Sequence, residues 1–490
     1  MIFPVFRSAK HSLLVLTILL TACLPQGLGD VTPVPATDTP LPGPTVTPLP
    51  TRPEYDPGAL VDYTAQAGDT LPGLAGRFNT TIGEIRQANP QIPADSTTMP
   101  AGMPMKIPIY YRPFWGTPYQ ILPDSQYIDG PPVDGFDTSI FVATHPGWLK
   151  DYVGYAVDAN HTGAELVDIV ATNYSISPRL LLAILEYQTG ALSQPVEPSG
   201  DYPLGFVDYN YSGLYLQLVW AANILNVGYY GWRIGQLTEF DHLDGTVERP
   251  DPWQTAASVA LQYYFSRFAS PVAYARAVGA DGLARTFRSL FGDPWRSDQA
   301  FIPVSLHQPD FGFPFLDGET WNLTGGPHSG WGIAQLIPWS ALDFAPPSIS
   351  SGCTPSSHPV VAMADGVVVR SQTGVVVEDL DGDGNERTGW DILYLHVATD
   401  GRASVGKVLK RGDALGYPSC EGGEATGTHV HVARKYNGEW MPADSAIPFN
   451  LEGWIAHNGT DAYLGTLTRG TQVVIACSCA DAPSHIQAGK

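Results

Sequence analysis

The repeat distance of the apolar residues changes near residue 358, and no other feature constrains the fold of this 490-residue chain as strongly. Between residues 136 and 300 apolar residues recur at helical spacing, and the pair Ser177-Pro178 marks the start of one helix. Beyond residue 358 short apolar runs alternate with Gly/Asp turns, which is typical of β-strands. The sequence therefore predicts a multidomain chain in which a helical domain precedes an all-β domain, built as a barrel or a sandwich.

Composition and charge argue against a nucleic-acid-binding protein and indicate an exported one. The formal net charge is −22, and no basic block occurs outside the first dozen residues. Binding of phosphates needs clustered Lys and Arg, so the sequence predicts no nucleic acid partner. Residues 1–22 combine a basic start with an apolar stretch and small residues, which predicts a secretory signal peptide. No other segment is long and apolar enough to cross a bilayer.

The residues after the signal peptide predict a membrane anchor and a spacer. Residues 20–23 are LTAC and resemble the bacterial lipobox, whose cysteine becomes the lipid-modified first residue of the mature protein. The resemblance implies an exported protein that a lipid on Cys23 holds at the membrane, facing the cell wall. A plain signal peptide with an incidental Cys23 is the alternative. Residues 23–57 are rich in Pro and Thr, so we expect an extended, solvated linker.

Four further cysteines lie in the exported part of the chain, at positions 353, 420, 477 and 479. An even number in an oxidising compartment indicates disulfides, with three connectivities to choose from. Cys477 and Cys479 are too close in sequence for an easy bridge with each other. A bridge between Cys353 and Cys420 is therefore favoured.

Residues 58–112 predict a small β-α-α-β module, in which a short strand, a Gly-Asp turn and two helices precede the closing strand MKIPI. The module resembles the LysM family at Tyr63, Gly68-Asp69-Thr70, Leu74-Ala75, Phe78, Ile85 and Asn89-Pro90. The resemblance implies binding of peptidoglycan glycans in a groove between Gly68, Asp69 and Thr70 on one side and Asn89 and Pro90 on the other. A degenerate module that serves as a spacer is the alternative.

The helical region, residues 136–300, resembles the lysozyme-like fold of soluble lytic transglycosylases, in which a helix ending in Glu-Ser-Gly supplies the catalytic glutamate. Aligned on Gly190, this chain has Gln188 and Thr189 at the other two positions. Gln cannot protonate a leaving group, because general acid catalysis needs an ionisable carboxyl. Glu186 lies about 200° around the helix from Gln188. We therefore expect a non-catalytic domain that holds glycan or is structural, with a site rescued through Glu186 as the alternative.

Two of the twelve histidines, His429 and His431, flank a single valine just after a Thr-Gly-Thr turn. Side chains two residues apart in a strand project from the same face, so the two imidazoles are expected side by side. Such an arrangement suits a metal ion or a proton-transfer pair. A solvated edge strand that happens to carry histidine is the alternative.

Four motifs, in order along the chain, resemble the lysostaphin/LytM-type zinc endopeptidases. They are V-x-A-x-x-D-G-x-V at 360–368, LYLH at 393–396, GDALGYPS at 412–419 and TGTHVH at 426–431. The resemblance implies that residues 301–450 form an all-β zinc peptidase domain that cuts peptide cross-links of peptidoglycan.

Carried over by position, this resemblance implies His328, Asp343 and His431 as Zn²⁺ ligands and His396 and His429 as the catalytic pair. Three ligands leave a fourth position for a water whose pKa the metal lowers to about 7, and two more imidazoles serve proton transfer and oxyanion stabilisation. The family spacing is His-x-x-x-Asp, which puts the histidine four positions before the aspartate, whereas His328 stands fifteen positions before Asp343. If His328 is not a ligand, a non-catalytic peptidoglycan-binding scaffold or an activator of another wall hydrolase is the alternative.

Two remaining segments are assigned less chemistry. Asp379, Asp381 and Asp383 resemble the start of an EF-hand loop, but the twelfth position is Trp390 and not Glu. A polar hairpin turn is favoured there, with weak Ca²⁺ binding as the alternative. Residues 451–490 predict additional strands and a frayed tail without evident chemistry.

Overall fold

The computed structural model describes residues 49–157, 159–347, 351–479 and 481–489. The predicted signal peptide, the lipidation site Cys23 and the linker up to residue 48 lie outside the described residues, and their assignments stay predictions. Within the described ranges, no helix combines the length and the apolar character needed to cross a membrane.

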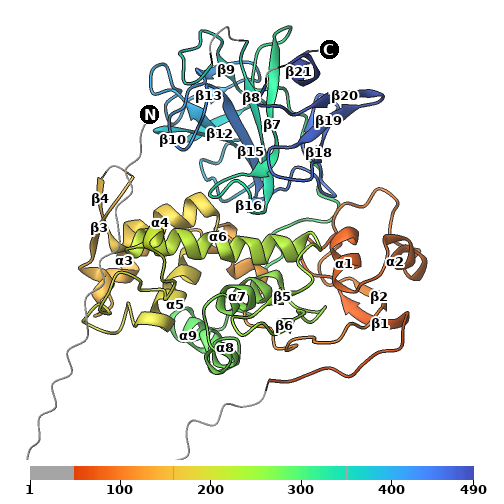
Figure 1. Cartoon of the computed structure of the whole chain (residues 1–490), viewed down its shortest axis with the longest axis vertical. Coiled ribbons are helices and arrows are strands. Elements are labelled where there is room, and N and C mark those ends of the chain that lie inside the picture. Colours follow the sequence, from red (N-terminus) through yellow and green to blue (C-terminus); the bar gives the residue numbers. More distant parts are fainter. Residues whose placement is uncertain (1–48, 158, 348–350, 480, 490) are drawn as a thin grey trace, which may run out of the picture. The chain divides into compact units, whose positions relative to one another are not determined.

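The N-terminal module has the predicted β-α-α-β order (Figure 1). Strands β1 (Ala59–Thr64) and β2 (Pro104–Ile109) pair antiparallel, with α1 (Leu71–Arg77) and α2 (Ile82–Ala88) between them in sequence. The hydroxyl of Thr81 and the carboxylate of Glu84 form a capping box that starts α2. Apolar side chains from all four elements form a hydrophobic core separate from that of the rest of the chain.

The middle of the chain is mostly helical, as its period predicts. Its helices are α3 (Thr138–Ala143), α4 (Gly163–Tyr174), α5 (Pro178–Thr189), α6 (Leu214–Arg233), α7 (Ala256–Ser266), α8 (Pro271–Ala277) and α9 (Leu283–Phe291). Two short ribbons interrupt them, β3 (Val153–Ala156) with β4 (Ala159–Thr162) and β5 (Phe240–Asp241) with β6 (Val247–Glu248). Helix α6 is buried along most of its length, so it is the central element of this region. Ser177 precedes α5 as predicted, although its side chain makes no capping hydrogen bond.

The C-terminal region is built on one large antiparallel sheet, in the order β13-β10-β11-β12-β15-β8-β7-β21, with β16 beside β15. Its strands are β7 (Thr320–Ser329), β8 (Trp339–Ala345), β10 (Gly366–Gln372), β11 (Gly374–Asp379), β12 (Trp390–Val397), β13 (Val408–Leu409), β15 (Val430–Tyr436), β16 (Glu439–Trp440) and β21 (His485–Gln487). A second sheet contains β17 (Asn450–Leu451), β18 (Trp454–Asn458), β19 (Gly465–Arg469) and β20 (Gln472–Ile475), and β9 (Val360–Val361) pairs with β14 (Ala414–Gly416). The predicted all-β region is therefore present, as one long sheet with a smaller sheet beside it.

The helical and β regions share one hydrophobic core. Strands β11 and β12 are buried at every position, and one continuous apolar cluster runs from the helices into the large sheet. Charged side chains cross the same boundary: Arg233 of α6 donates two hydrogen bonds to Glu439 of β16, and Lys435 of β15 donates to the carbonyl of Thr172 in α4. At the predicted domain border near residue 300 the chain thus changes from helices to strands, but one hydrophobic core continues across it.

Residues 451–490 correct the prediction of a frayed tail. Strand β21 pairs with β7 and becomes the edge strand of the large sheet. Cys477 and Cys479 form a disulfide in this segment, and Cys353 is bridged to Cys420. The backbone hydrogen bonds between β21 and β7 hold His485–Gln487 at what would otherwise be an open sheet edge.

The three aspartates of DLDGDG form the hairpin turn between β11 and β12. Both carboxylate oxygens of Asp379 accept backbone N–H groups of the turn, and Asp383 accepts the hydroxyl of Thr388. Asp381 accepts the N–H of Asp383. These hydrogen bonds explain why aspartates occupy the turn, because their carboxylates accept the backbone N–H groups there. Calcium binding at this turn is not supported.

A buried carboxyl on β11 makes the stability of the β region depend on pH. Glu378 is completely buried and accepts a hydrogen bond from the hydroxyl of Tyr394 at 2.6 Å. Burial raises the pKa of this carboxyl to about 8. The folded protein therefore keeps a proton on Glu378 over a pH range in which the unfolded chain has lost it.

We expect the free energy of unfolding to fall as the pH rises from about 4.5 to about 8. In this range the folded state, which keeps the proton on Glu378, binds more protons than the unfolded state. Glu378→Gln should remove this dependence and should stabilise the protein at pH 8 by up to about 4 kcal/mol more than at pH 5. Urea denaturation of both proteins at the two pH values measures the difference. An effect of the substitution that is equal at both pH values would contradict the prediction.

Candidate metal centre

Three adjacent strands bring the predicted ligands together. Asp343 of β8 and His431 of β15 are direct partners in the antiparallel register, and His328 lies on β7, the other neighbour of β8. Facing side chains on paired strands lie close enough to share a ligand. The fourteen residues between His328 and Asp343 belong to the β7–β8 hairpin, so two residues that are far apart in sequence lie on adjacent strands.

The side chains of His328, Asp343 and His431 form a compact, buried cluster whose ligand atoms all lie within 4.8 Å of one another. The Oδ1 atom of Asp343 lies 3.3 Å from Nε2 of His328 and 3.3 Å from Nδ1 of His431, and the two ring nitrogens are 3.0 Å apart. Two imidazole nitrogens and one carboxylate oxygen form a donor set suited to Zn²⁺. The side chains present therefore fit the metal that the sequence implies.

Backbone carbonyls select the ring nitrogens that face the cluster. Nδ1 of His328 lies 2.9 Å from the carbonyl oxygen of Gly326, and Nε2 of His431 lies 3.1 Å from that of Gly330. A carbonyl only accepts, so each of these nitrogens carries the proton when the ring is neutral. The lone pairs of the other two nitrogens then point at the common centre, as metal ligation requires.

The carboxyl of Asp343 is held in its ionised form. Burial by itself disfavours the charge, but the protonated rings of His328 and His429 outweigh burial and keep the pKa of Asp343 well below its usual value, and the carboxylate in turn raises the pKa of His328. Burial lowers the pKa of His431, with a further contribution from His328. An ionised carboxylate beside a neutral imidazole is the protonation state in which both groups can ligate a cation.

The predicted catalytic pair lies beside this cluster. The rings of His396 and His429 are 4.5 Å apart between centroids, and Nε2 of His429 lies 3.8 Å from Oδ2 of Asp343. Nδ1 of His396 hydrogen-bonds to the carbonyl of Glu421, and Nδ1 of His429 to that of Gly427. These bonds leave Nε2 as the basic atom of each neutral ring. Burial, followed by the neighbouring His429, lowers the pKa of His396 to about 3, so this ring is neutral near pH 7.

A bulge in β12 directs His396 toward the cluster. The register between β11 and β12 shifts at Gly374, and His396 has a φ of +67°, which is unusual for a residue with a side chain. A bulge turns a side chain away from the direction that regular alternation would give it. Backbone strain of this kind is concentrated at functional sites.

The helical region supports the hairpin that carries the ligands. The side-chain oxygen of Asn223 in α6 accepts the N–H of Ile333, at the tip of the β7–β8 hairpin, at 3.1 Å. Asn223 is buried and also donates to the carbonyl of Val219 in its own helix. This bond ties the loop between two predicted ligands to an element more than a hundred residues away in sequence.

Tyr463 is a residue of the site that sequence analysis missed. Its ring stacks on the imidazole of His328, with 4.2 Å between centroids, and its carbonyl accepts the N–H of Gly326. It belongs to residues 451–490, where no chemistry was expected. No pattern in the sequence marks this tyrosine, because its position depends on how the second sheet packs beside β7.

Comparisons with known proteins found two matching family models and several similar chains. Residues 63–108 match the model of the LysM domain, and residues 120–304 match that of the LasA N-terminal domain. Protease LasA of Pseudomonas aeruginosa is 26% identical over 344 residues, which cover 66% of this chain and 76% of LasA. The β-lytic metalloendopeptidase of Lysobacter enzymogenes is 26% identical over 129 residues, which cover 26% of this chain and 70% of that protein.

The chain is related to the LytM-type peptidases and carries a LysM domain. Among solved structures, the M23 metalloprotease pseudoalterin is 23% identical, and the match covers 34% of this chain and 96% of pseudoalterin with a TM-score of 0.29. A zinc-containing peptidase from Vibrio cholerae is 20% identical, with 29% and 41% coverage and a TM-score of 0.22. The helical region matches the LasA N-terminal domain, and the predicted lysozyme-like fold is not confirmed.

The LysM residues expected to touch glycan have internal partners in the structure. The carboxylate of Asp69 pairs with Arg77 at 2.8 Å and accepts the hydroxyl of Tyr63, and the hydroxyl of Thr70 caps α1. The side chain of Asn89 bonds to the backbone of Ile85 and Lys106. These three residues therefore shape the loops of the domain.

The turn at Gly68 lies against the helical region. A side chain at this position would come within 2.3 Å of the guanidinium group of Arg233, which donates to the carbonyl of Ala67. Pro90 is exposed on the opposite loop. Of the five positions predicted for glycan, only Pro90 is thus freely presented to solvent.

The end of helix α5 is occupied by structural hydrogen bonds. Gln188 donates to the carbonyl of Leu204 and accepts the hydroxyl of Tyr264, so both ends of its amide have partners. The carboxylate of Glu186 accepts the N–H groups of Leu192 and Ser193. These hydrogen bonds hold the end of α5 against its neighbours, and the absence of catalysis in the helical region stays a prediction.

We expect the purified protein to bind about one Zn²⁺ per chain and His328→Ala to lose it, because removal of one of three ligands leaves an incomplete set. Mass spectrometry of metal content after dialysis measures the occupancy. His307→Ala is the matched control, since His307 is exposed and outside the cluster. Full zinc content in His328→Ala would show that another group is the third ligand.

We expect Asn223→Ala to weaken zinc affinity about tenfold, as is typical when a group that orients a metal ligand is removed. Asn226→Ala is the control: Asn226 lies one turn further along α6 and bonds to Tyr127 and Tyr174, without contact to the hairpin. Competition with a chromophoric chelator measures the affinity. Equal zinc affinities in the two variants would contradict a role of Asn223 in positioning the ligands.

Proposed function

We propose that the protein is an exported zinc endopeptidase that hydrolyses peptide cross-links of peptidoglycan. The observation that carries this proposal is the convergence of His328, Asp343 and His431 on one buried point with two further imidazoles beside them. The match to the LysM domain and the similarity to Protease LasA support a substrate in the cell wall. The lipobox-like LTAC segment supports anchoring at the membrane through Cys23.

In the proposed reaction, His328, Asp343 and His431 would hold Zn²⁺, which would supply a Lewis acid for the scissile carbonyl and would lower the pKa of the attacking water. Nε2 of His429 would take up the proton that the attacking water loses and return it to the leaving amine, because its Nδ1 already donates to the carbonyl of Gly427. His396 stays neutral near pH 7 and offers its Nε2 in the same space. The bulge at His396 holds the two rings in position before substrate arrives, which lowers the reorganisation needed in the transition state.

The LysM domain and the helical region do not take part in the reaction in this proposal. The LysM domain keeps the enzyme at the glycan strands, and the helical region supports the hairpin that carries two ligands. The rival function is a scaffold or activator without catalysis, which rested on the unusual spacing between His328 and Asp343. The adjacency of β7 and β8 removes the reason for preferring that rival.

We expect the protein to release peptides from purified peptidoglycan, and a chelator to stop this release. His396→Ala and His429→Ala should keep zinc but lose about a hundredfold or more in turnover, as expected when a proton-transfer group is removed. His307→Ala is again the control. Chromatography of released peptides measures the rate, and metal content is determined on the same samples. Unchanged release after chelation, or full activity in His429→Ala, would refute the proposal.

A further inference from the structure

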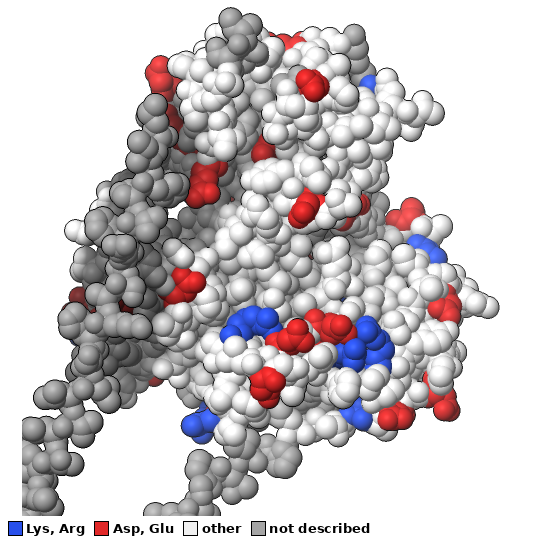
Figure 2. Space-filling model, in the orientation of Figure 1, with Lys and Arg blue, Asp and Glu red and all other residues white. Residues whose placement is uncertain are grey.

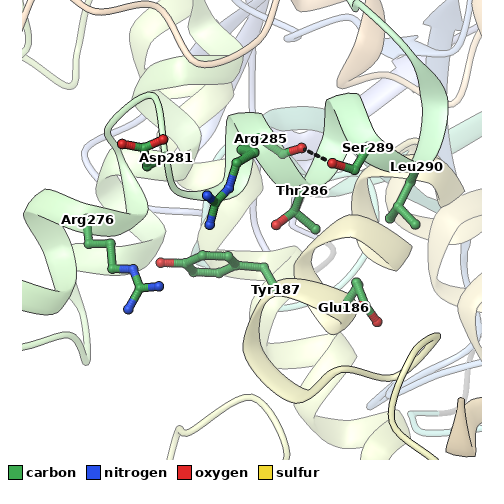
Figure 3. A pocket seen from close by; sticks show the side chains of 8 residues that line it. All are labelled: Glu186, Tyr187, Arg276, Asp281, Arg285, Thr286, Ser289 and Leu290. Carbon is green, nitrogen blue, oxygen red and sulfur yellow. Dashed lines mark hydrogen bonds between the residues drawn. The ribbon is translucent and has the colours of Figure 1, made fainter. Parts of the chain in front are cut away.

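A second polar cavity lies in the helical region, apart from the metal centre. It has a volume of about 330 Å³ and lies between the end of α5, helix α8 and helix α9. We call it the arginine pocket, and its polar lining comes chiefly from Tyr187, Arg276, Asp281, Arg285 and Thr286 (Figure 3). No residue of the metal centre lines it.

The two arginines of the pocket differ from the other arginines of the described chain. The protein is strongly acidic, and most Lys and Arg side chains on the face shown in Figure 2 lie beside acidic ones. Arg233 and Arg387, for example, are paired with Glu439 and Asp129. Within the described part of the chain, the guanidinium groups of Arg276 and Arg285 make no hydrogen bond or ion pair.

The unpaired guanidinium groups share one space. Figure 3 shows both side chains extending toward the hydroxyl end of Tyr187. The ring of Tyr187 packs edge-on against Phe265, with 5.8 Å between centroids. This contact fixes the orientation of the tyrosine ring in the pocket. Two cations brought together in this way repel each other, and an anion between them relieves the repulsion.

The acidic side chains of the pocket do not neutralise these cations. Glu186 uses its carboxylate to accept the N–H groups of Leu192 and Ser193. Asp281 makes no ion pair with either arginine and has no hydrogen-bond partner in the described chain. The pocket therefore presents two free guanidinium groups and, separately, one free carboxylate.

We propose that the arginine pocket binds the free amino-acid end of an uncrosslinked stem peptide, a group that carries a carboxylate and an ammonium. The planar forks of Arg276 and Arg285 donate to the carboxylate, and Asp281 accepts from the ammonium. The volume lies at the lower end of the range for small-ligand sites and fits a peptide end better than a glycan chain. That the ligand comes from the cell wall rests on the function proposed above.

Isothermal titration of the full-length protein with L-alanyl-γ-D-glutamyl-meso-diaminopimelic acid tests this site. We expect binding, and a loss of about tenfold or more in affinity in Arg276→Gln and in Arg285→Gln, because each removes a charged donor. Asp281→Asn should also weaken binding while both guanidinium groups remain. Arg296→Gln is the control, because Arg296 is exposed and pairs with Asp293 outside the pocket. Metal content should be equal in all variants.

The remaining outcomes separate this proposal from the peptidase. No binding of the tripeptide, or binding unchanged in both arginine variants, would overturn the pocket. Inorganic phosphate that binds as tightly as the tripeptide and with the same dependence on the arginines would overturn the choice of an amino-acid ligand. Failure of the peptidase proposal would show in a different assay, as the absence of zinc-dependent peptide release from peptidoglycan.

Discussion

The metal centre depends on the antiparallel register of β15, β8 and β7. Asp343 faces His431 directly, and a slip of one residue would turn one of the two side chains to the other face of the sheet. Val430 and Val432, on either side of His431, are completely buried, as are Leu342 and Phe344 beside Asp343. Burial of these apolar neighbours fixes the register, so packing of the core sets the geometry of the site.

The helical region acts as a support for this sheet. The ion pair of Arg233 with Glu439 is buried, and it joins α6 to the strand that extends β15. Asp124 lies 3.6 Å from the same guanidinium group, and burial raises the pKa of Asp124 to about 6. Buried charges of this kind add specificity to an interface, because an alternative docking would leave them unpaired. With Asn223 holding the hairpin, the helical region and the β region form one structural unit.

A hydrogen bond to a backbone carbonyl orients each of the four histidines of the site. Each uses one ring nitrogen for a backbone carbonyl, and the carbonyls belong to Gly326, Gly330, Glu421 and Gly427. The other ring nitrogen is left free to ligate or to accept a proton. The two proposed roles therefore differ by position: His328 and His431 converge on Asp343, whereas His396 and His429 lie to one side.

The sequence by itself determined the local structure and half of the site. Alternation along a strand places His429 and His431 on one face, the capping residue Thr81 starts a helix, and the change of period separates helices from strands. These features depend on neighbours in sequence. That His328 reaches Asp343, that Tyr463 covers His328 and that β21 closes the edge of the sheet were decided only by the tertiary structure, because pairing across strands depends on loop closure and core packing between distant segments.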